Sequence, residues 1–362
     1  MQEPLSILHI CNYYFGSKVH VELFDHMIKL CPNMKVYAAY SERTELKNLD
    51  REYLIANQDY RYIDRINFFN KSKKIRDGLK KNINLKDIDI IHAHTVFTDG
   101  YVAYKIYKEL NIPYVVAVRN TDINAFFKIY KNTGKKILLN AKKIVCLSEG
   151  YKKRISKMFD NRTNEIIKKK CIAIPNGIDD FWFNRPIKEK EKNKEELTVI
   201  TSANFDKNKN LEVILKACDI LQQEQKIKLF ICGKLMYKNL QEEISKRSYI
   251  EYLGYIDKEA FAEYLDKSDV FVLLSHHETF GLVYAEALSR GVPVIYTKDE
   301  GFDGQFKEGE VGYSCYPNDF NSLKEKIKQA IKINSIHKFE INIFNWSEIV
   351  GRYIKIYKEV IK

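Results

Sequence analysis

Short apolar runs alternate with longer amphipathic segments through the first half of the chain. The runs are rich in Ile and Val and have no polar face, which is typical of buried parallel strands. Strands are predicted at residues 5–11, 35–40, 87–94, 114–118, 142–148 and 171–175. Segments 18–31, 98–110 and 149–159 have helical periodicity, and Ser148 stands where the N-cap of the last helix is expected.

The alternation stops at residues 176–196 and then resumes. This stretch contains Asn, Gly, Pro and a run of charges, as a linker does. Strands are then predicted at 197–203, 226–233, 249–254, 269–275 and 293–297, and helices at 209–223, 237–246, 258–267, 280–290 and 319–332.

Repeated strand–helix units predict an α/β protein with two Rossmann-like, doubly wound domains that face a cleft. We expect an N-terminal domain over 1–180, a linker over 181–196, a C-terminal domain over 197–340 and a closing segment over 341–362. Ligands of such sheets bind beyond the carboxyl ends of the strands. The loops that follow the predicted strands are therefore the place to look for a site.

Residues 276–295 carry the strongest sign of function. Glu278 follows a predicted strand, and Glu286 comes eight positions later inside a predicted helix. The backbone N–H groups of residues 280–282 would point out of the N-terminus of that helix, where an anion is favoured. Two carboxylates beside such an anion seat predict a ligand that combines phosphate with hydroxyl groups, as a sugar nucleotide does.

Positive charge is concentrated in the first half. Residues 1–184 contain 32 Lys and Arg against 20 Asp and Glu, which accounts for the whole net charge of +12. Basic and aromatic residues occur together at 66–81 and 124–143, a combination that suits an anionic membrane surface. The alternative is an ordinary solvated helix face. No nucleic-acid motif is visible, and we expect no nucleic-acid partner.

Other features of the sequence indicate a soluble, cytoplasmic protein. Several of the seven cysteines lie inside apolar runs without a CxxC pair, which predicts buried free thiols. The N-terminus lacks the pattern of a signal peptide, and no apolar run is long enough to span a bilayer. There is no DxD, HExxH or Cys/His ligand spacing, so we expect a metal-independent protein without a cofactor.

The chain resembles the family 4 retaining glycosyltransferases of the GT-B fold (glycosyl transferases group 1) over nearly its whole length. The resemblance rests on the E-x7-E pair Glu278 and Glu286, IPNGID (174–179), KNLEVILKA (209–217), HAH (92–94) and NWSEIVGRYIKIYKEVI (345–361). It implies transfer of a hexose from a nucleotide sugar, for which we expect UDP, to a sugar or lipid-linked sugar acceptor. The process would be synthesis of a cell-surface polysaccharide, and the closing helix would pack back on the first domain.

The resemblance also assigns roles to residues of the donor side. Glu278 would contact hydroxyls of the donor sugar, and Glu286 would bind the ribose. Lys209 would neutralise the diphosphate as a point charge, while Asn204 stands where the family usually has an arginine. The donor-binding candidates are Gly16, Asn204, Lys209, Glu278, Phe280, Gly281, Leu282 and Glu286.

Candidates for the reaction centre and the acceptor lie in the first half. His92 and His94 alternate on a strand and share a face, and by resemblance His94 lies near the anomeric centre; a structural pair is the alternative. With Lys209 and Glu278, His94 completes the catalytic candidates. Arg119, Asn120 and Asp122 follow a predicted strand and are expected to bind the acceptor, although Asp122 would serve equally well as a helix cap.

Two other functions remain open from the sequence. A nucleotide-sugar epimerase of the GT-B fold would use the same donor without an acceptor. A sugar-nucleotide-binding protein without activity is the other possibility, because Asn204 removes one cation from the expected phosphate clamp.

Overall fold

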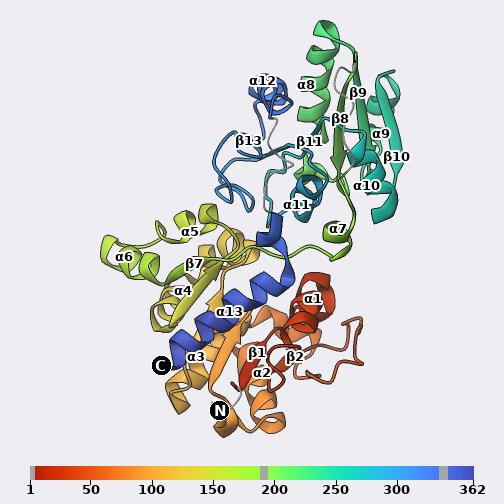
Figure 1. The fold of residues 1–362 in the computed structure, drawn as a ribbon. Coiled ribbons are helices and arrows are strands. Elements are labelled where there is room, and N and C mark those ends of the chain that lie inside the picture. The colour runs from red at the N-terminus through yellow and green to blue at the C-terminus, as the bar shows by residue number, and fades with distance from the viewer. Residues whose placement is uncertain (1–4, 188–194, 334–340) are drawn as a thin grey trace. The chain divides into compact units, whose positions relative to one another are not determined.

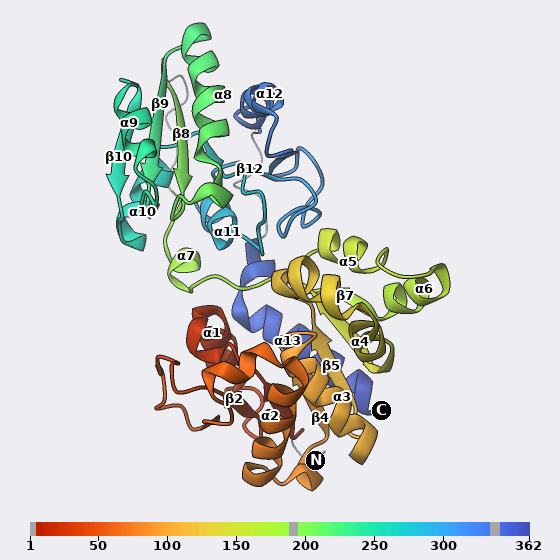
Figure 2. The same ribbon diagram turned by 180° about the vertical axis from the view of Figure 1, so that it is seen from behind.

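The computed structural model describes residues 5–187, 195–333 and 341–362. The chain divides into two compact units (Figure 1; Figure 2). The first comprises Met1–Gly177 with Trp346–Lys362, and the second comprises Ile178–Asn345. Each unit has its own parallel sheet and its own hydrophobic core, so the two are described separately.

The first unit is built on a parallel sheet of seven strands in the order β3-β2-β1-β4-β5-β6-β7. These are β1 (Ile7–Ile10), β2 (Lys35–Ala39), β3 (Leu54–Asn57), β4 (Ile90–Ala93), β5 (Tyr114–Ala117), β6 (Lys143–Cys146) and β7 (Cys171–Ala173). The chain order reverses between β1 and β4, where His9 pairs with His92. Loops at the carboxyl ends diverge at such a reversal, the topological switch point, and leave room for a ligand.

In the described part of this unit, six helices connect these strands, and four of them begin at polar N-caps. The connecting helices are α1 (Lys18–Met27), α2 (Phe68–Asn82), α3 (Thr98–Leu110), α4 (Phe127–Asn140), α5 (Glu149–Ile155) and α6 (Asn161–Lys170). Ser17, Asn67, Ser148 and Asp160 accept hydrogen bonds from backbone N–H groups in the first turns of α1, α2, α5 and α6. The N-cap predicted at Ser148 is therefore present.

The last helix, α13 (Trp346–Ile361), belongs to the core of the first unit. It packs beside α1 in the core layer over β1 and β4 (Figure 1). Its buried residues recur at helical spacing: Trp346, Ile349, Val350, Tyr353, Ile356 and Tyr357. The closing segment predicted from residue 341 is shorter in the structure, because Ile341–Phe344 forms a 3-10 turn in the second unit, where Phe344 packs against Phe280 and Phe302.

The second unit has a parallel sheet in the order β10-β9-β8-β11-β12-β13. Its strands are β8 (Leu197–Ser202), β9 (Ile227–Cys232), β10 (Ile250–Gly254), β11 (Val270–Val272), β12 (Val294–Thr297) and β13 (Gly312–Cys315). Its helices are α7 (Phe181–Asn184), α8 (Leu211–Glu224), α9 (Asn239–Ser245), α10 (Lys258–Asp266), α11 (Leu282–Ser289) and α12 (Phe320–Ala330). The chain order reverses between β8 and β11, so this unit has a switch point of its own.

The predicted α/β class with two Rossmann-like sheets is confirmed. Within the predicted linker over 181–196, Phe181–Asn184 forms α7 and buries Trp182 against Phe261; residues 188–194 lie outside the described residues. The edge strand β3 and the terminal strand β13 were not predicted, and neither were the helices α2, α4 and α6. The three helices are rich in Lys and Asn, and neither strand has more than four residues.

Candidate functional site

Lys209 and Glu278 meet at the switch point of the second unit. Lys209 lies in the loop after β8 and Glu278 in the loop after β11. The Lys209 Nζ donates to the Glu278 Oε2 at 2.8 Å. The carboxylate is largely buried, whereas the lysine side chain is a quarter exposed, so the ammonium group can also reach a ligand. Two of the three predicted catalytic residues are thus brought together.

The carboxylate of Glu278 is held by neighbours on both oxygens. The Ser275 Oγ donates to its Oε2 at 3.0 Å, and the backbone N–H of Thr279 donates to its Oε1 at 3.1 Å. These bonds, together with the one from the Lys209 ammonium, hold the carboxylate in one orientation. Glu278 is therefore a hydrogen-bond acceptor in a fixed position.

The loop that carries Glu278 is braced by two residues that the sequence did not single out. Asn208 accepts from the backbone N–H of His277 at 2.9 Å and donates to the backbone oxygen of His277 at 3.0 Å. The buried Glu300 accepts from the backbone N–H of Glu278 at 3.0 Å. These bonds fix the loop because Asn208 ties it to the loop after β8 and Glu300 ties it to the loop after β12.

The sequence predicted that a helix begins at Lys209, but the structure places this residue before the helix. It ends a 3-10 turn, Lys207–Lys209, and Asn210 adopts a left-handed conformation before α8 starts at Leu211. The Asp206 side chain caps this turn by accepting from the Lys209 N–H at 3.0 Å. Asn204, in the place of the family's arginine, is exposed on the same loop.

Helix α11 begins two residues later than predicted, at Leu282. Gly281 precedes it with a φ of 75°, a left-handed conformation that favours glycine. A Cβ at Gly281 would lie 2.3 Å from the Tyr284 ring. The Phe280 side chain is buried against Phe302 and Phe344. The Gly281–Leu282 backbone therefore forms the turn at the N-terminus of α11, with Phe280 as its anchor.

Glu286 lies in the second turn of α11 and is partly buried. Within the described residues its carboxyl group has no hydrogen bond or ion pair. Burial, with a smaller contribution from the negative charge of Asp179, raises the pKa of Glu286 to about 7. An acid that is desolvated without a protein partner is a candidate for a ligand contact.

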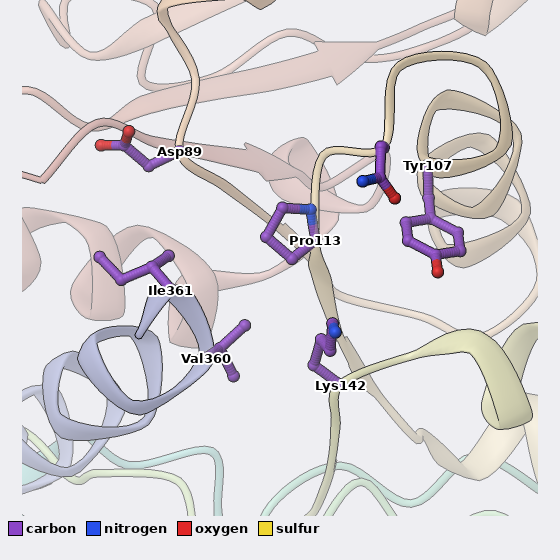
Figure 3. A pocket seen from close by; sticks show the side chains of 7 residues that line it. Asp89, Tyr107, Pro113, Lys142, Val360 and Ile361 are labelled. Atoms are coloured by element: carbon purple, nitrogen blue, oxygen red, sulfur yellow. The ribbon is translucent and has the colours of Figure 1, made fainter.

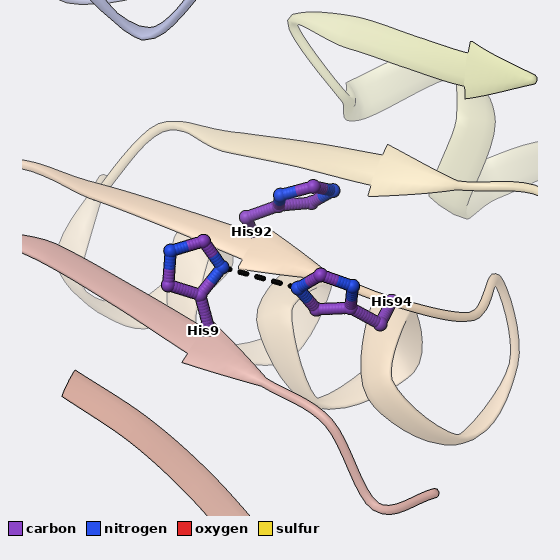
Figure 4. A group of neighbouring side chains, drawn as sticks. All are labelled: His9, His92 and His94. Carbon is purple, nitrogen blue, oxygen red and sulfur yellow. Dashed lines mark hydrogen bonds between the residues drawn. The ribbon is translucent and has the colours of Figure 1, made fainter. Parts of the chain in front are cut away.

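In the first unit, four histidines form a buried cluster at the β1/β4 switch point. The Nδ1 of His9 and the Nε2 of His94 share a hydrogen bond of 3.1 Å (Figure 4). His92 stacks on His94 with ring centroids 4.2 Å apart, and its Nδ1 lies 2.6 Å from the Tyr357 hydroxyl of α13. His20 of α1 packs edge-on against His94. Because of this burial, the pKa of His94 lies well below its usual range and the imidazole is neutral.

This cluster is denser than the HAH motif alone predicts. His9, His92 and His94 each bring a ligand atom within 4.8 Å of the others, and Cys11, His20 and His94 do the same. The sequence shows no such spacing, because His9 comes from β1 and the other two from β4. The absence of Cys/His ligand spacing along the sequence therefore does not exclude such a cluster in the fold, and metal independence stays a prediction.

The acceptor candidates follow β5 and have different environments. The Arg119 Nε donates to the backbone oxygen of His94 at 3.1 Å. Asn120 is partly exposed. The Asp122 carboxylate is buried and accepts from the backbone N–H groups of Val96, Phe97 and Arg119 at 3.1, 3.3 and 2.9 Å.

Asp122 therefore braces two loops, with backbone donors on both of its oxygens, and its assignment to the acceptor stays a prediction. Gly16 ends a 3-10 turn just before α1 and is exposed. It lies in the loop that follows β1. A Cβ there would lie 2.8 Å from the ring of Tyr13.

A pocket of about 310 Å³ lies at the opposite, amino edge of the first sheet (Figure 3). Asp89, Pro113 and Lys142 in its lining each precede a strand, and Val360 and Ile361 come from the end of α13. None of the predicted site residues lines it. It belongs to the face remote from the switch point.

Comparison with known proteins covers both units. The family described as "Glycosyltransferase Family 4" matches residues 22–180, and "Glycosyl transferases group 1" matches residues 183–343. An uncharacterized glycosyltransferase of Methanocaldococcus jannaschii is 28% identical over 374 residues, 96% of this chain and 95% of the relative. The alpha-monoglucosyldiacylglycerol synthase of Streptococcus pneumoniae is 28% identical over 58% of this chain and 51% of its own length.

Among solved structures, the HepE protein of Anabaena in complex with UDP-glucose has the same fold. The TM-score is 0.62 at 14% sequence identity, with 98% of each chain covered.

Proposed function

The chain belongs to the family 4 glycosyltransferases of the GT-B fold, and we propose that this enzyme transfers a hexose from a UDP-sugar with retention of anomeric configuration. The acceptor would be a sugar or a lipid-linked sugar in the synthesis of capsule, lipopolysaccharide or exopolysaccharide. The observation that carries the proposal is the Lys209–Glu278 pair at the switch point of the second unit, beside the glycine-led start of α11.

The chemistry requires stabilisation of a departing diphosphate and positioning of a sugar whose anomeric carbon becomes cationic. In this proposal Lys209 places its ammonium group on the diphosphate, and the N–H groups of Gly281 and Leu282 add oriented donors. Glu278 accepts hydrogen bonds from sugar hydroxyls, because its oxygens already lie fixed by Ser275 and Thr279. Glu286 accepts from the ribose hydroxyls.

On the acceptor side, His94 contributes a neutral ring. A neutral imidazole can accept a hydrogen bond from a hydroxyl without placing a positive charge beside the cationic anomeric carbon. Arg119 and Asn120, in the loop after β5, are the side chains we assign to acceptor contact. This reaction is proposed to need no metal ion or cofactor.

The lipid-linked acceptor leads to a proposal on location. Among the helices in the described ranges, none combines the length and apolarity that crossing a bilayer requires. One relative is named for a diacylglycerol product. The net charge of +12 resides in the N-terminal half. We therefore place the enzyme in the cytoplasm, in peripheral contact with the inner face of the cell membrane.

The test is an assay of purified enzyme with UDP-, GDP- and ADP-hexoses and a short-chain lipid-linked saccharide acceptor. We expect transfer from the UDP-sugar and, by NMR, an α-linked product from an α-linked donor. A β-linked product would refute retention. An epimerised donor formed without acceptor would instead identify an isomerase.

Donor binding is also expected to depend on pH through Glu286. Its pKa of about 7 lies above the unfolded value near 4.5, so the folded enzyme binds the extra proton between these values. The stability that this group contributes falls as pH rises through that window. Because the ribose needs the ionised carboxylate, calorimetry should show UDP-hexose binding about tenfold weaker at pH 6 than at pH 8, with proton release. Glu286→Gln should bind more weakly and with a flat profile; a wild-type profile in that variant would contradict the assignment.

A further inference from the structure

The two basic-aromatic segments of the sequence form one surface in the structure. Helices α2 and α4 both pack against α3 (Figure 2). Their N-terminal ends are joined by aromatic rings: Phe68 lies 5.1 Å from Tyr130 and 6.3 Å from Phe126, and Phe69 lies 5.8 Å from Tyr130. Segments some sixty residues apart are therefore neighbours. We call this surface the basic-aromatic face.

Large apolar side chains of this face are exposed to solvent. Ile66 is 80% exposed, Ile129 is 73% exposed and Phe69 is 46% exposed. Within the described residues, Ile66 and Ile129 are the most exposed aliphatic side chains of the chain. Single exposed apolar residues are ordinary, but three beside one ring cluster form a patch that indicates an interaction site.

The exposed charges nearest this patch are positive, and the acidic residue of α2, Asp77, lies in the C-terminal half of that helix. Arg65, Lys73, Lys128 and Lys131 are exposed. Residues 65–76 and 123–143 contain no Asp or Glu at all. The acidic residues just before these two segments, Asp64 and Asp122, are both buried, and Asp64 is paired with Lys74 at 2.7 Å. The partner of this face is therefore anionic at its surface.

Exposed isoleucines among lysines favour a lipid surface over nucleic acid. Nucleic acid would neutralise the lysines but would leave Ile66 and Ile129 in water, since aliphatic side chains do not stack on bases. An anionic bilayer offers negative headgroups and, beneath them, an apolar layer a few ångströms deep. We propose that the basic-aromatic face docks on a bilayer rich in acidic phospholipid, with Ile66, Phe69 and Ile129 inserted between the headgroups.

The position of the face links docking to the acceptor site, and this step rests on the proposed function. In a parallel sheet the connecting helices begin at the carboxyl edge, so α2 and α4 both start on the side of Arg119 and Asn120. The ring of Phe126 stacks on Phe97 at 5.2 Å, and the Phe97 N–H is bound by Asp122. The face and the acceptor loop are thus one packed structure, and docking places the acceptor loop close to lipid headgroups.

The experiment is co-sedimentation of the full-length enzyme with vesicles of phosphatidylcholine alone or with 40% phosphatidylglycerol, at low and high salt. We expect binding to the mixed vesicles that weakens with salt. The variant Lys73→Gln/Lys128→Gln/Lys131→Gln should lose about fivefold in partition coefficient for each charge removed. The variant Ile66→Ser/Phe69→Ser/Ile129→Ser should lose at least tenfold.

Matched controls lie on the same unit. Lys168→Gln/Lys169→Gln on α6 removes exposed charge elsewhere, and Leu30→Ser/Leu110→Ser removes leucines that are 57% and 50% exposed. Both controls should bind vesicles as the wild type does. Unchanged vesicle binding in the face variants would overturn the proposal. So would an RNA-binding assay in which the lysine variant loses binding to RNA while its binding to vesicles is unchanged.

Transfer to a soluble, short-chain acceptor is measured in parallel. A face variant that keeps this activity but fails on acceptor embedded in vesicles supports the proposal. Wild-type enzyme that binds vesicles but transfers no sugar would refute the proposed function and leave the docking face standing.

Discussion

Glu278→Gln is expected to lower kcat/KM for hexosyl transfer by about 10²–10³-fold, the size of effect seen when one preorganised charge-stabilising contact is removed. The amide has nearly the same shape but no charge. It can no longer pair with the Lys209 ammonium at 2.8 Å, and it presents a donor where sugar hydroxyls need an acceptor. Initial-rate kinetics with varied UDP-sugar measure the loss.

Lys209→Met should cause a loss of similar size, seen in both donor affinity and rate. The double variant is expected to lose less than the product of the two single losses, because each single change leaves the partner's charge without its pair. Lys216→Met is the matched control, since that lysine is exposed on α8. Wild-type kcat/KM in Glu278→Gln would remove Glu278 from the site, provided that circular dichroism shows the variant folded.

The position of Lys209 beside Glu278 follows from backbone topology, whereas their roles toward the donor rest on the family resemblance. Alternating strands and helices place the loops after β8 and β11 at one switch point. That is enough to bring Lys209 and Glu278 together, although they lie 69 positions apart. What could not be predicted is the support of the loop. Asn208, Ser275 and Glu300 are ordinary polar residues, and only the folded loops show which carbonyl or N–H each one meets.

Local geometry explains why two residues have other surroundings than the sequence led us to expect. Lys209 was taken for the start of a helix because the apolar periodicity begins there, but Asn210 enters the left-handed region and delays α8. Asp122 was a candidate acceptor ligand because it follows a strand. Three backbone N–H groups from two loops converge on it, and no sequence pattern reports such convergence.

The histidine cluster shows the same limit in another form. The HAH triplet identifies His92 and His94, but His9 and Tyr357 reach them from β1 and from α13. His9 reads in sequence as part of an ordinary apolar strand. Only the parallel pairing of β1 with β4 sets it beside His92. Neutral, buried imidazoles are therefore a property of the sheet order and not of the motif.

The largest effect on stability is expected at Arg290, which is fully buried just after α11. Its Nε donates to the Asp266 Oδ1 at 2.8 Å, and its two terminal nitrogens donate to the backbone oxygens of Arg185 and Pro186, both at 2.8 Å. It ties α10 and the segment after α7 to the helix that carries Glu286. Arg290→Met would leave Asp266 as a buried charge without a partner, which costs about 3–5 kcal/mol.

The two tryptophans allow this loss to be assigned to a unit, because Trp182 lies in the second and Trp346 in the first. In a Trp346→Phe background, urea unfolding followed by Trp182 fluorescence should shift to a markedly lower midpoint with Arg290→Met. When unfolding is followed by Trp346 fluorescence in a Trp182→Phe background, Arg290→Met should leave the midpoint of the first unit unchanged or shift it much less. Lys246→Met, an exposed lysine paired with Glu242 and Glu243, is the control and should change the free energy of unfolding by less than about 0.5 kcal/mol. An equally small change for Arg290→Met would show that the buried ion pair adds little to this fold, as replacement of whole buried pairs does elsewhere.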